Sequence, residues 1–175
     1  MYTYDYIKSS DVIISPKVWA SYQYLYNKRL KFSKKYLEKY AKIVEYSIGV
    51  LSNDLNFDSK VRVGFCRFKG FRGGEYNSQY NCIGMMVYRG IESTLNLLAH
   101  ELVHAEQYHE GRLANGSGKF HWNNGPSDKV SVPYHANYNY NRYKNLPWEV
   151  EAFTRSPQLT EKHLKVVTEY AESLS

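Results

Sequence analysis

Cysteine is scarce in this sequence, which has only two, Cys66 and Cys82, in 175 residues. Two cysteines are too few for a disulfide framework and lack the spacing of a thiolate metal site, so we interpret both as small buried apolar side chains. The sequence also lacks any apolar run of about 18 residues, which argues against a membrane-spanning helix. The N-terminal segment MYTYDYIKSSDVIIS has neither the basic part nor the long apolar part of a secretory signal, so we expect a cytoplasmic protein.

Apolar and aromatic residues, by contrast, are plentiful, at 43% and 16% of the chain. A chain of this length can bury a core of its own, so we expect residues 1–175 to form a single domain. The net charge of +6 would suit an anionic partner. The densest group of basic residues, over residues 26–42, is interleaved with apolar residues at helical spacing. This pattern favours an exposed helix face over nucleic-acid binding by the segment.

Helical and strand-like patterns follow one another along the chain. Residues 33–55 predict a long helix whose apolar face consists of Leu37, Tyr40, Ile43, Val44, Ile48 and Leu51. Ser15 and Pro16 are suited to begin an earlier helix over residues 15–30. Next we expect strands within 60–68 and 81–90, separated by a glycine-rich loop around Gly70, Gly73 and Gly74, and then a helix over 91–112. Residues 114–146 predict an irregular region with strand-like pieces at 119–122 and 129–134. A helix from 147 that ends before Pro157 and a last helix over 160–174 complete the chain.

The predicted helix over residues 91–112 carries the motif HELVH, from His100 to His104. At about 100° per residue, His104 lies about 40° and Glu101 about 100° around the helix from His100, so the three polar residues share one edge. Two histidines one turn apart can give two nitrogens to one Zn²⁺, while the glutamate lies beside the metal and can accept a proton from a water that the metal activates. Apolar residues cover most of the remaining circumference. Unpaired polar groups there would be destabilising by several kcal/mol, which argues against a coincidental match.

A catalytic zinc needs a third protein ligand and an open fourth position. The extended form of the motif would require Gly and His where this chain has Gln107 and Glu110, so that form is excluded. His109 lies about 180° around the helix from His100 and cannot reach the same metal. The later segment NLPWEVEAF predicts a short helix that carries Glu149 and Glu151. These two lie about 200° apart, so only one of them can face the metal.

The motif HELVH, followed about 45 residues later by PWEVEAF, resembles a minimal gluzincin, a zincin metallopeptidase with two histidines on the motif helix and a glutamate on a later one. It is similar above all to small bacteriophage and bacterial zincin-like proteins. The resemblance implies an α+β zincin-like fold with N-terminal helices, a short twisted sheet, the motif helix and a later helix with the third ligand. Many larger gluzincins have the pattern E-x-x-A-D, and alignment on Ala152 makes Glu149 the ligand. The aspartate, which orients a histidine ligand, is replaced by Phe153.

The orientation of the later helix supports the same choice. Phe153 follows Glu149 by four residues and shares its face, so a buried Phe153 would turn Glu149 inward. Glu151 instead matches Arg155 four residues later, a spacing that suits an exposed ion pair. We therefore expect Glu149 to be the third zinc ligand.

The resemblance implies zinc-dependent hydrolysis of peptide bonds in a protein or peptide substrate. Zinc would be held by His100, His104 and Glu149, with Glu101 as the base. A tyrosine or histidine usually stabilises the oxyanion, and the candidates are Tyr140, Tyr143, His121 and His135, with the two tyrosines taken as catalytic. The strand within residues 81–90 would form the sheet edge that the substrate backbone joins.

Other classes of protein share this type of motif. SprT-like and Spartan-type zincins act on proteins bound to DNA, which the positive charge favours, but they have a third histidine in place of a glutamate. A second alternative is a regulatory or repressor-cleaving protease of a phage or bacterium. A third is a zincin scaffold with a structural or virion-associated role, which would place a phage-encoded protein in the virion or the host cytoplasm. Glu101 argues against this last alternative, because a structural zinc has no use for a base.

Overall fold

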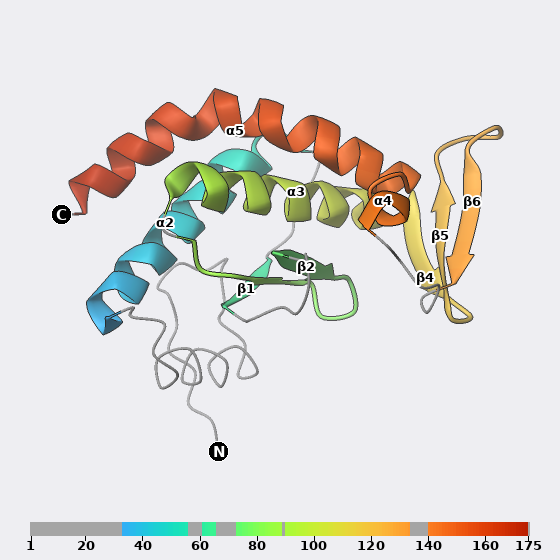
Figure 1. Ribbon diagram of the computed structural model, residues 1–175, viewed down its shortest axis with the longest axis horizontal. Coiled ribbons are helices and arrows are strands. Elements are labelled where there is room, and N and C mark those ends of the chain that lie inside the picture. The colour runs from blue at the N-terminus through green and yellow to red at the C-terminus, as the bar shows by residue number, and fades with distance from the viewer. Residues whose placement is uncertain (1–32, 56–60, 66–72, 89, 134–139, 175) are drawn as a thin grey trace, which may run out of the picture.

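The computed structural model describes residues 33–55, 61–65, 73–88, 90–133 and 140–174 of the chain (Figure 1). The helix predicted over residues 15–30, together with Cys66 and His135, lies outside these ranges. Within them, helices and two small sheets form an α+β arrangement, as predicted. None of the described helices combines the length and the apolar character needed to cross a membrane.

Helix α2, Lys34–Ser52, is the first described element, and it confirms the helix predicted over residues 33–55. The hydroxyl of Ser33 caps it by accepting a hydrogen bond from the backbone N–H of Tyr36, at 3.1 Å. All six residues of the predicted apolar face are buried. Lys35 and Lys42 are exposed, so the described part of the basic segment behaves as the predicted exposed face.

The first sheet contains β1 (Arg62–Phe65), β2 (Gly74–Asn77) and β3 (Cys82–Met85), in the order β1-β3-β2. Strands β1 and β3 are parallel, and β2 is antiparallel to β3. Both predicted strands are confirmed, but two expectations are wrong. Gly74 begins a strand instead of lying in a loop, and β3 is the central strand, so it cannot form the sheet edge. The expectation that Cys82 is buried is wrong as well: it is half-buried, because burial alternates along β3 and the core side of the strand carries Ile83 and Met85.

Helix α3, Ile91–His109, runs between the first sheet and helix α5, Pro147–Ser173 (Figure 1). Its most extensive contact is with α5, and it also packs against α2 and β2. The apolar core lies between these elements and includes Leu95, Leu98 and Leu102 of α3, all fully buried. Because α3 is covered on several sides, its polar residues are buried along with its apolar ones.

Helix α5 is continuous and arched, which contradicts the predicted break at Pro157 (Figure 1). Proline has no N–H for the carbonyl four residues earlier, that of Phe153. Both Pro157 and Phe153 are exposed, so water can satisfy this carbonyl and the helix continues. Packing of the face that carries Ala152, Val167 and Ala171 into the core then holds both halves of the helix in place.

The second sheet is an antiparallel meander of β4 (Leu113–Gly116), β5 (Lys119–Asn123) and β6 (Lys129–Pro133). It includes both strand-like pieces predicted within residues 114–146, so this region is more regular than expected. Strands β4 and β5 join through Ser117 and Gly118, which both have positive φ angles, as a tight hairpin turn requires. A small core of Leu113, Trp122, Val132 and Trp148 attaches this sheet to the start of α5. Helix α4, Tyr140–Tyr143, precedes α5.

Candidate metal centre

Helix α3 brings the three polar residues of its motif together on a buried edge. His100 and His104 are each 7% exposed and Glu101 is 4% exposed. The Nε2 atoms of the two histidines lie 3.2 Å apart, and their rings are nearly perpendicular, with centroids 4.8 Å apart. Residues one helical turn apart meet in this way, as the sequence spacing predicted.

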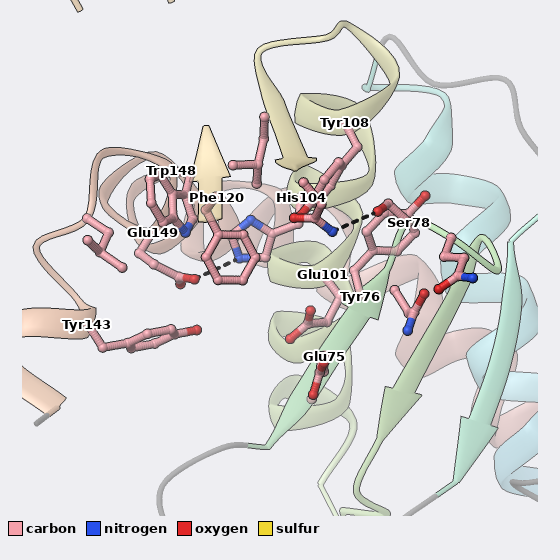
Figure 2. Close-up of a pocket in the computed structure, with 16 residues that line it drawn as sticks. Glu75, Tyr76, Ser78, Glu101, His104, Tyr108, Phe120, Tyr143, Trp148 and Glu149 are labelled. Atoms are coloured by element: carbon pink, nitrogen blue, oxygen red, sulfur yellow. Dashed lines mark hydrogen bonds and ion pairs between the residues drawn. The ribbon is translucent and has the colours of Figure 1, made fainter. Parts of the chain in front are cut away.

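Glu149 reaches the same point from the first turn of α5 (Figure 2). Its Oε2 lies 3.2 Å from His100 Nε2, and its Oε1 lies 3.4 Å from His104 Nε2. Glu149 is only 4% exposed. One ligand atom from each of these three residues lies within 4.8 Å of the other two. No other histidine, cysteine or acidic side chains among the described residues form such a group of three.

The distances within this triad suit a shared metal ion. Two ligand atoms on a tetrahedral zinc, each about 2.0–2.1 Å from the ion, lie about 3.3 Å apart. The two histidine Nε2 atoms lie 3.2 Å apart, close to this value, and each has a different oxygen of Glu149 at a similar distance, 3.2 Å for Oε2 and 3.4 Å for Oε1. Glu149 Oε2 is also buried and makes no hydrogen bond with any described residue, although such atoms are rarely left without one. The residues therefore fit a divalent metal ion held by two nitrogens and a carboxylate.

The electrostatics of the metal-free site follow from burial and from the Glu149 charge. Burial alone would lower the pKa of His104, but the charge and hydrogen bond of Glu149 outweigh it and raise that pKa to about 9. Burial alone would raise the pKa of Glu149, but the charge of His104 and close contact with both imidazoles lower it to about 2. Without metal, a proton on His104 therefore balances the charge of Glu149.

Glu101 lies beside the triad, against strand β2. Burial raises the pKa of its carboxyl group, although both imidazoles act in the opposite direction. The carboxylate accepts a hydrogen bond from the backbone of Tyr76. A Cβ atom on Gly74 would lie 2.8 Å from Glu101 Oε1 and 2.9 Å from Leu97 Cδ1. The strand can approach Glu101 this closely only because residue 74 is glycine.

Glu151 points away from the triad and joins a group of charges between α3 and α5. Arg112 contacts it at 2.5 Å and Arg155 at 2.8 Å. The predicted contact with Arg155 is therefore present, but the prediction of an exposed pair is wrong, since the Glu151 side chain is 23% exposed. Arg155 also pairs with Glu106 of α3, which is 4% exposed. The pair between Arg155 and Glu106 joins α5 directly to α3.

The prediction that a buried Phe153 orients Glu149 is wrong as well. Phe153 is 39% exposed and lies over the ring of His100, with centroids 4.6 Å apart. Trp148, the residue before Glu149, is the anchor instead, because it is 3% exposed and packs in the small core beneath the second sheet. With Trp148 and Ala152 held inward, Glu149 lies over the histidines and Glu151 over the arginines.

The triad opens into a cleft of about 560 Å³ between β2, the second sheet and the start of α5 (Figure 2). A smaller cavity of about 330 Å³ adjoins it and shares Gly74, Glu101 and Tyr143 with it. The described residues that line the two cavities include three carboxylates, Glu75, Glu101 and Glu149. The described lining of the cleft thus contains carboxylates and no lysine or arginine, despite the positive net charge of the chain.

The structure separates the other residues that the sequence suggested for catalysis. Tyr143 lines both cavities, and Figure 2 shows its hydroxyl pointing toward Glu101. Tyr140 lines only the smaller cavity and is 46% exposed. His121 lies on β5, where its ring nitrogens bond to the carbonyl of Gly116 and the hydroxyl of Ser131, so it is not brought to the triad.

Gln107 is the residue that the sequence analysis missed. It was considered only as a departure from the extended motif, yet its Oε1 lies 2.8 Å from Nδ1 of His104, where it can orient the ring. The signal available in the sequence was its position three residues after His104, on the same side of the helix. That spacing does not reveal the burial of Gln107, which depends on α5.

Comparison with known protein families, with curated proteins and with solved structures finds no match to this chain.

Proposed function

We propose that the protein is a zinc-dependent peptidase in which His100, His104 and Glu149 hold the metal. The observation that carries this proposal is the convergence of the three ligand atoms at one end of a cleft, with Glu101 beside them. Two imidazoles and one carboxylate are a frequent ligand set of catalytic zinc, and they leave a fourth position for a water molecule or substrate. A purely structural zinc would instead have four protein ligands.

Each nearby side chain has a distinct role in this proposal. A bound Zn²⁺ would acidify a water molecule and polarise the carbonyl of the scissile peptide bond. Glu101 accepts the proton of the attacking water and then donates it to the leaving amine. Burial, which raises the pKa of Glu101, favours this return of the proton. Tyr143 points toward Glu101 across the cleft (Figure 2) and donates a hydrogen bond to the developing oxyanion.

The cleft also suggests which kind of substrate it accepts. Strand β2 lies at an edge of the described sheet and lines the cleft, so an extended peptide can pair with its backbone. Away from β2 the cleft is lined by Leu113, Phe120, Leu146 and Trp148, which suits a bulky apolar side chain of the substrate.

The charge of the cleft argues against one of the alternatives. The described residues that line the cleft include no lysine or arginine, so none of them offers such a cation to the phosphates of a DNA strand. A glutamate, not a histidine, also completes the triad. A protease with a peptide substrate is therefore favoured over one whose cleft binds DNA.

The test is digestion of a mixture of peptides by the zinc-loaded protein, followed by mass spectrometry. We expect cleavage beside bulky apolar residues, and Glu101→Gln should reduce the rate by orders of magnitude while zinc stays bound. Tyr143→Phe should reduce kcat by about 10²–10³-fold. Tyr140→Phe, its matched control, should leave kcat nearly unchanged. Equal activity of wild type and Glu101→Gln would show that the cleavage comes from a contaminant or another site.

A further inference from the structure

We infer that Gln107 is the positioning residue of this centre: it fixes which nitrogen of His104 faces the metal and docks the helical turn that carries Glu149. This inference rests on the proposed metal site. It does not depend on the reaction that the site performs. It follows from two hydrogen bonds made by one buried amide.

The first step is the orientation of the amide. Gln107 is fully buried, on the turn of α3 that follows His104. One end of its amide lies 3.0 Å from the backbone carbonyl of Trp148, and the other lies 2.8 Å from His104 Nδ1. A carbonyl oxygen can only accept a hydrogen bond, so the NH₂ group must face Trp148. The amide oxygen therefore faces the histidine.

The second step is the tautomer of the histidine. An amide oxygen only accepts, so His104 Nδ1 must carry a hydrogen. In the neutral imidazole the lone pair then belongs to Nε2. Nε2 is the atom that faces His100, at 3.2 Å, and Glu149, at 3.4 Å. Gln107 thus excludes the tautomer in which a hydrogen on Nε2 would block the metal.

The third step concerns the helix that supplies the carboxylate. Trp148 immediately precedes Glu149, so holding its carbonyl holds the first turn of α5 against α3. A further hydrogen bond from Gln107 reaches Glu151. The same amide therefore contacts a histidine of the triad through its oxygen, and through its NH₂ group it contacts α5 on either side of Glu149, at Trp148 and Glu151.

Gln107 also supplies a contact that the later helix lacks. The resemblance to gluzincins leads one to expect a histidine-orienting aspartate at position 153, and this chain has Phe153. Phenylalanine has no hydrogen-bonding group in its side chain, and Phe153 contacts the ring of His100 instead. The acceptor for a ligand histidine comes here from the motif helix itself, one turn beyond His104.

Two variants separate the two roles of Gln107. Gln107→Met has a similar volume and no amide, so it loses the hydrogen bonds to His104, Trp148 and Glu151. Gln107→Glu keeps an acceptor for His104 and loses the N–H donors to α5. Ser47→Ala is the control: its buried hydroxyl bonds within α2, so its loss should affect stability without affecting the metal site.

The first readout is the affinity for Zn²⁺ alone, measured by competition with a chromophoric chelator. We expect Gln107→Met to bind about 10–100-fold more weakly, as is typical when the hydrogen-bond partner of a ligand histidine is removed. Gln107→Glu should regain most of this affinity, and Ser47→Ala should match the wild type. Wild-type affinity in Gln107→Met, or equal losses in the Met and Glu variants, would overturn the assignment.

The second readout does not require metal or activity. In the metal-free protein we expect the backbone amides of the first turns of α5 to exchange with solvent faster in both Gln107 variants than in Ser47→Ala. Nitrogen-15 spectra of His104 should show a hydrogen on Nδ1 in the wild type, held against exchange, and lose that protection in Gln107→Met. Unchanged exchange in both variants would overturn the inference. A wild type that binds zinc and hydrolyses no peptide would refute the proposed function only.

Discussion

The metal-free triad predicts a specific dependence of stability on pH. The pKa of His104 is raised from 6.5 to about 9 in the folded protein, so its contribution is complete below about pH 6.5 and is lost as the pH rises through 9. The pKa of Glu149 is lowered from 4.5 to about 2, so its contribution is complete above about pH 4.5 and is lost as the pH falls through 2. Both shifts describe one interaction, which is therefore strongest between about pH 4.5 and 6.5.

The magnitude follows from the shift at His104. A rise in pKa from 6.5 to about 9 corresponds to about 3 kcal/mol of stability at most. Both partners are more than nine-tenths buried, so solvent screens this interaction weakly. The free energy of unfolding of the metal-free protein should therefore decrease by about 1–3 kcal/mol between pH 6.5 and 9.5.

The assay is urea unfolding of chelator-treated protein at several pH values, with Glu149→Gln as the matched variant. This variant keeps the shape of Glu149 and removes its charge. Its free energy of unfolding should therefore fall less between pH 6.5 and 9.5 than that of the wild type, because His104 then lacks its charged partner Glu149. Other groups that titrate in this range affect both proteins equally. If wild type and Glu149→Gln lose stability in parallel from pH 6.5 to 9.5, the charge of Glu149 does not raise the pKa of His104, and the reasoning is refuted.

Three further predictions concern the surroundings of the triad. Gly74→Ala should lower kcat/KM while zinc stays bound, because its methyl group would lie 2.8 Å from Glu101 Oε1; an unchanged kcat/KM would show that β2 moves freely. Arg155→Met should destabilise the protein by about 3 kcal/mol in thermal or urea unfolding, because it takes the close partner from buried Glu106. Lys165→Met, which removes an exposed pair, should stay within about 0.5 kcal/mol, and equal effects would refute the role of burial. Zinc binding at pH 7 should release about one proton, visible by calorimetry in buffers of different ionisation enthalpy; binding without proton release would contradict the raised pKa of His104.

The elements that the sequence predicted well are those with long regular patterns. The apolar face of α2 repeats over five turns, and the motif of α3 lies within an apolar helix, so periodicity alone located both. Strand β2 was missed because the segment from Gly74 to Asn77 has no alternating pattern and depends on pairing with β3. The expected break at Pro157 failed because the proline is exposed, where water replaces the lost hydrogen bond.

The candidate site shows the same division between local and tertiary information. The spacing of His100, Glu101 and His104 determines their common edge, because it is a property of one helix. The choice between Glu149 and Glu151 depends instead on contacts between helices. Glu149 was chosen, and the structure does bring it to the histidines, but the reason given, a buried Phe153, was wrong. The actual determinants, such as burial of Trp148, are contacts that no local pattern reveals.

The most direct test of the metal centre is the zinc content of the purified protein, measured by elemental analysis after growth with added zinc. We expect about one Zn²⁺ per chain in the wild type and in Glu101→Gln, and almost none in His100→Ala, His104→Ala or Glu149→Ala. Glu151→Ala should retain the metal, because Glu151 faces the arginines. A wild-type protein without zinc, or loss of zinc in Glu151→Ala but not in Glu149→Ala, would contradict the assignment of the centre.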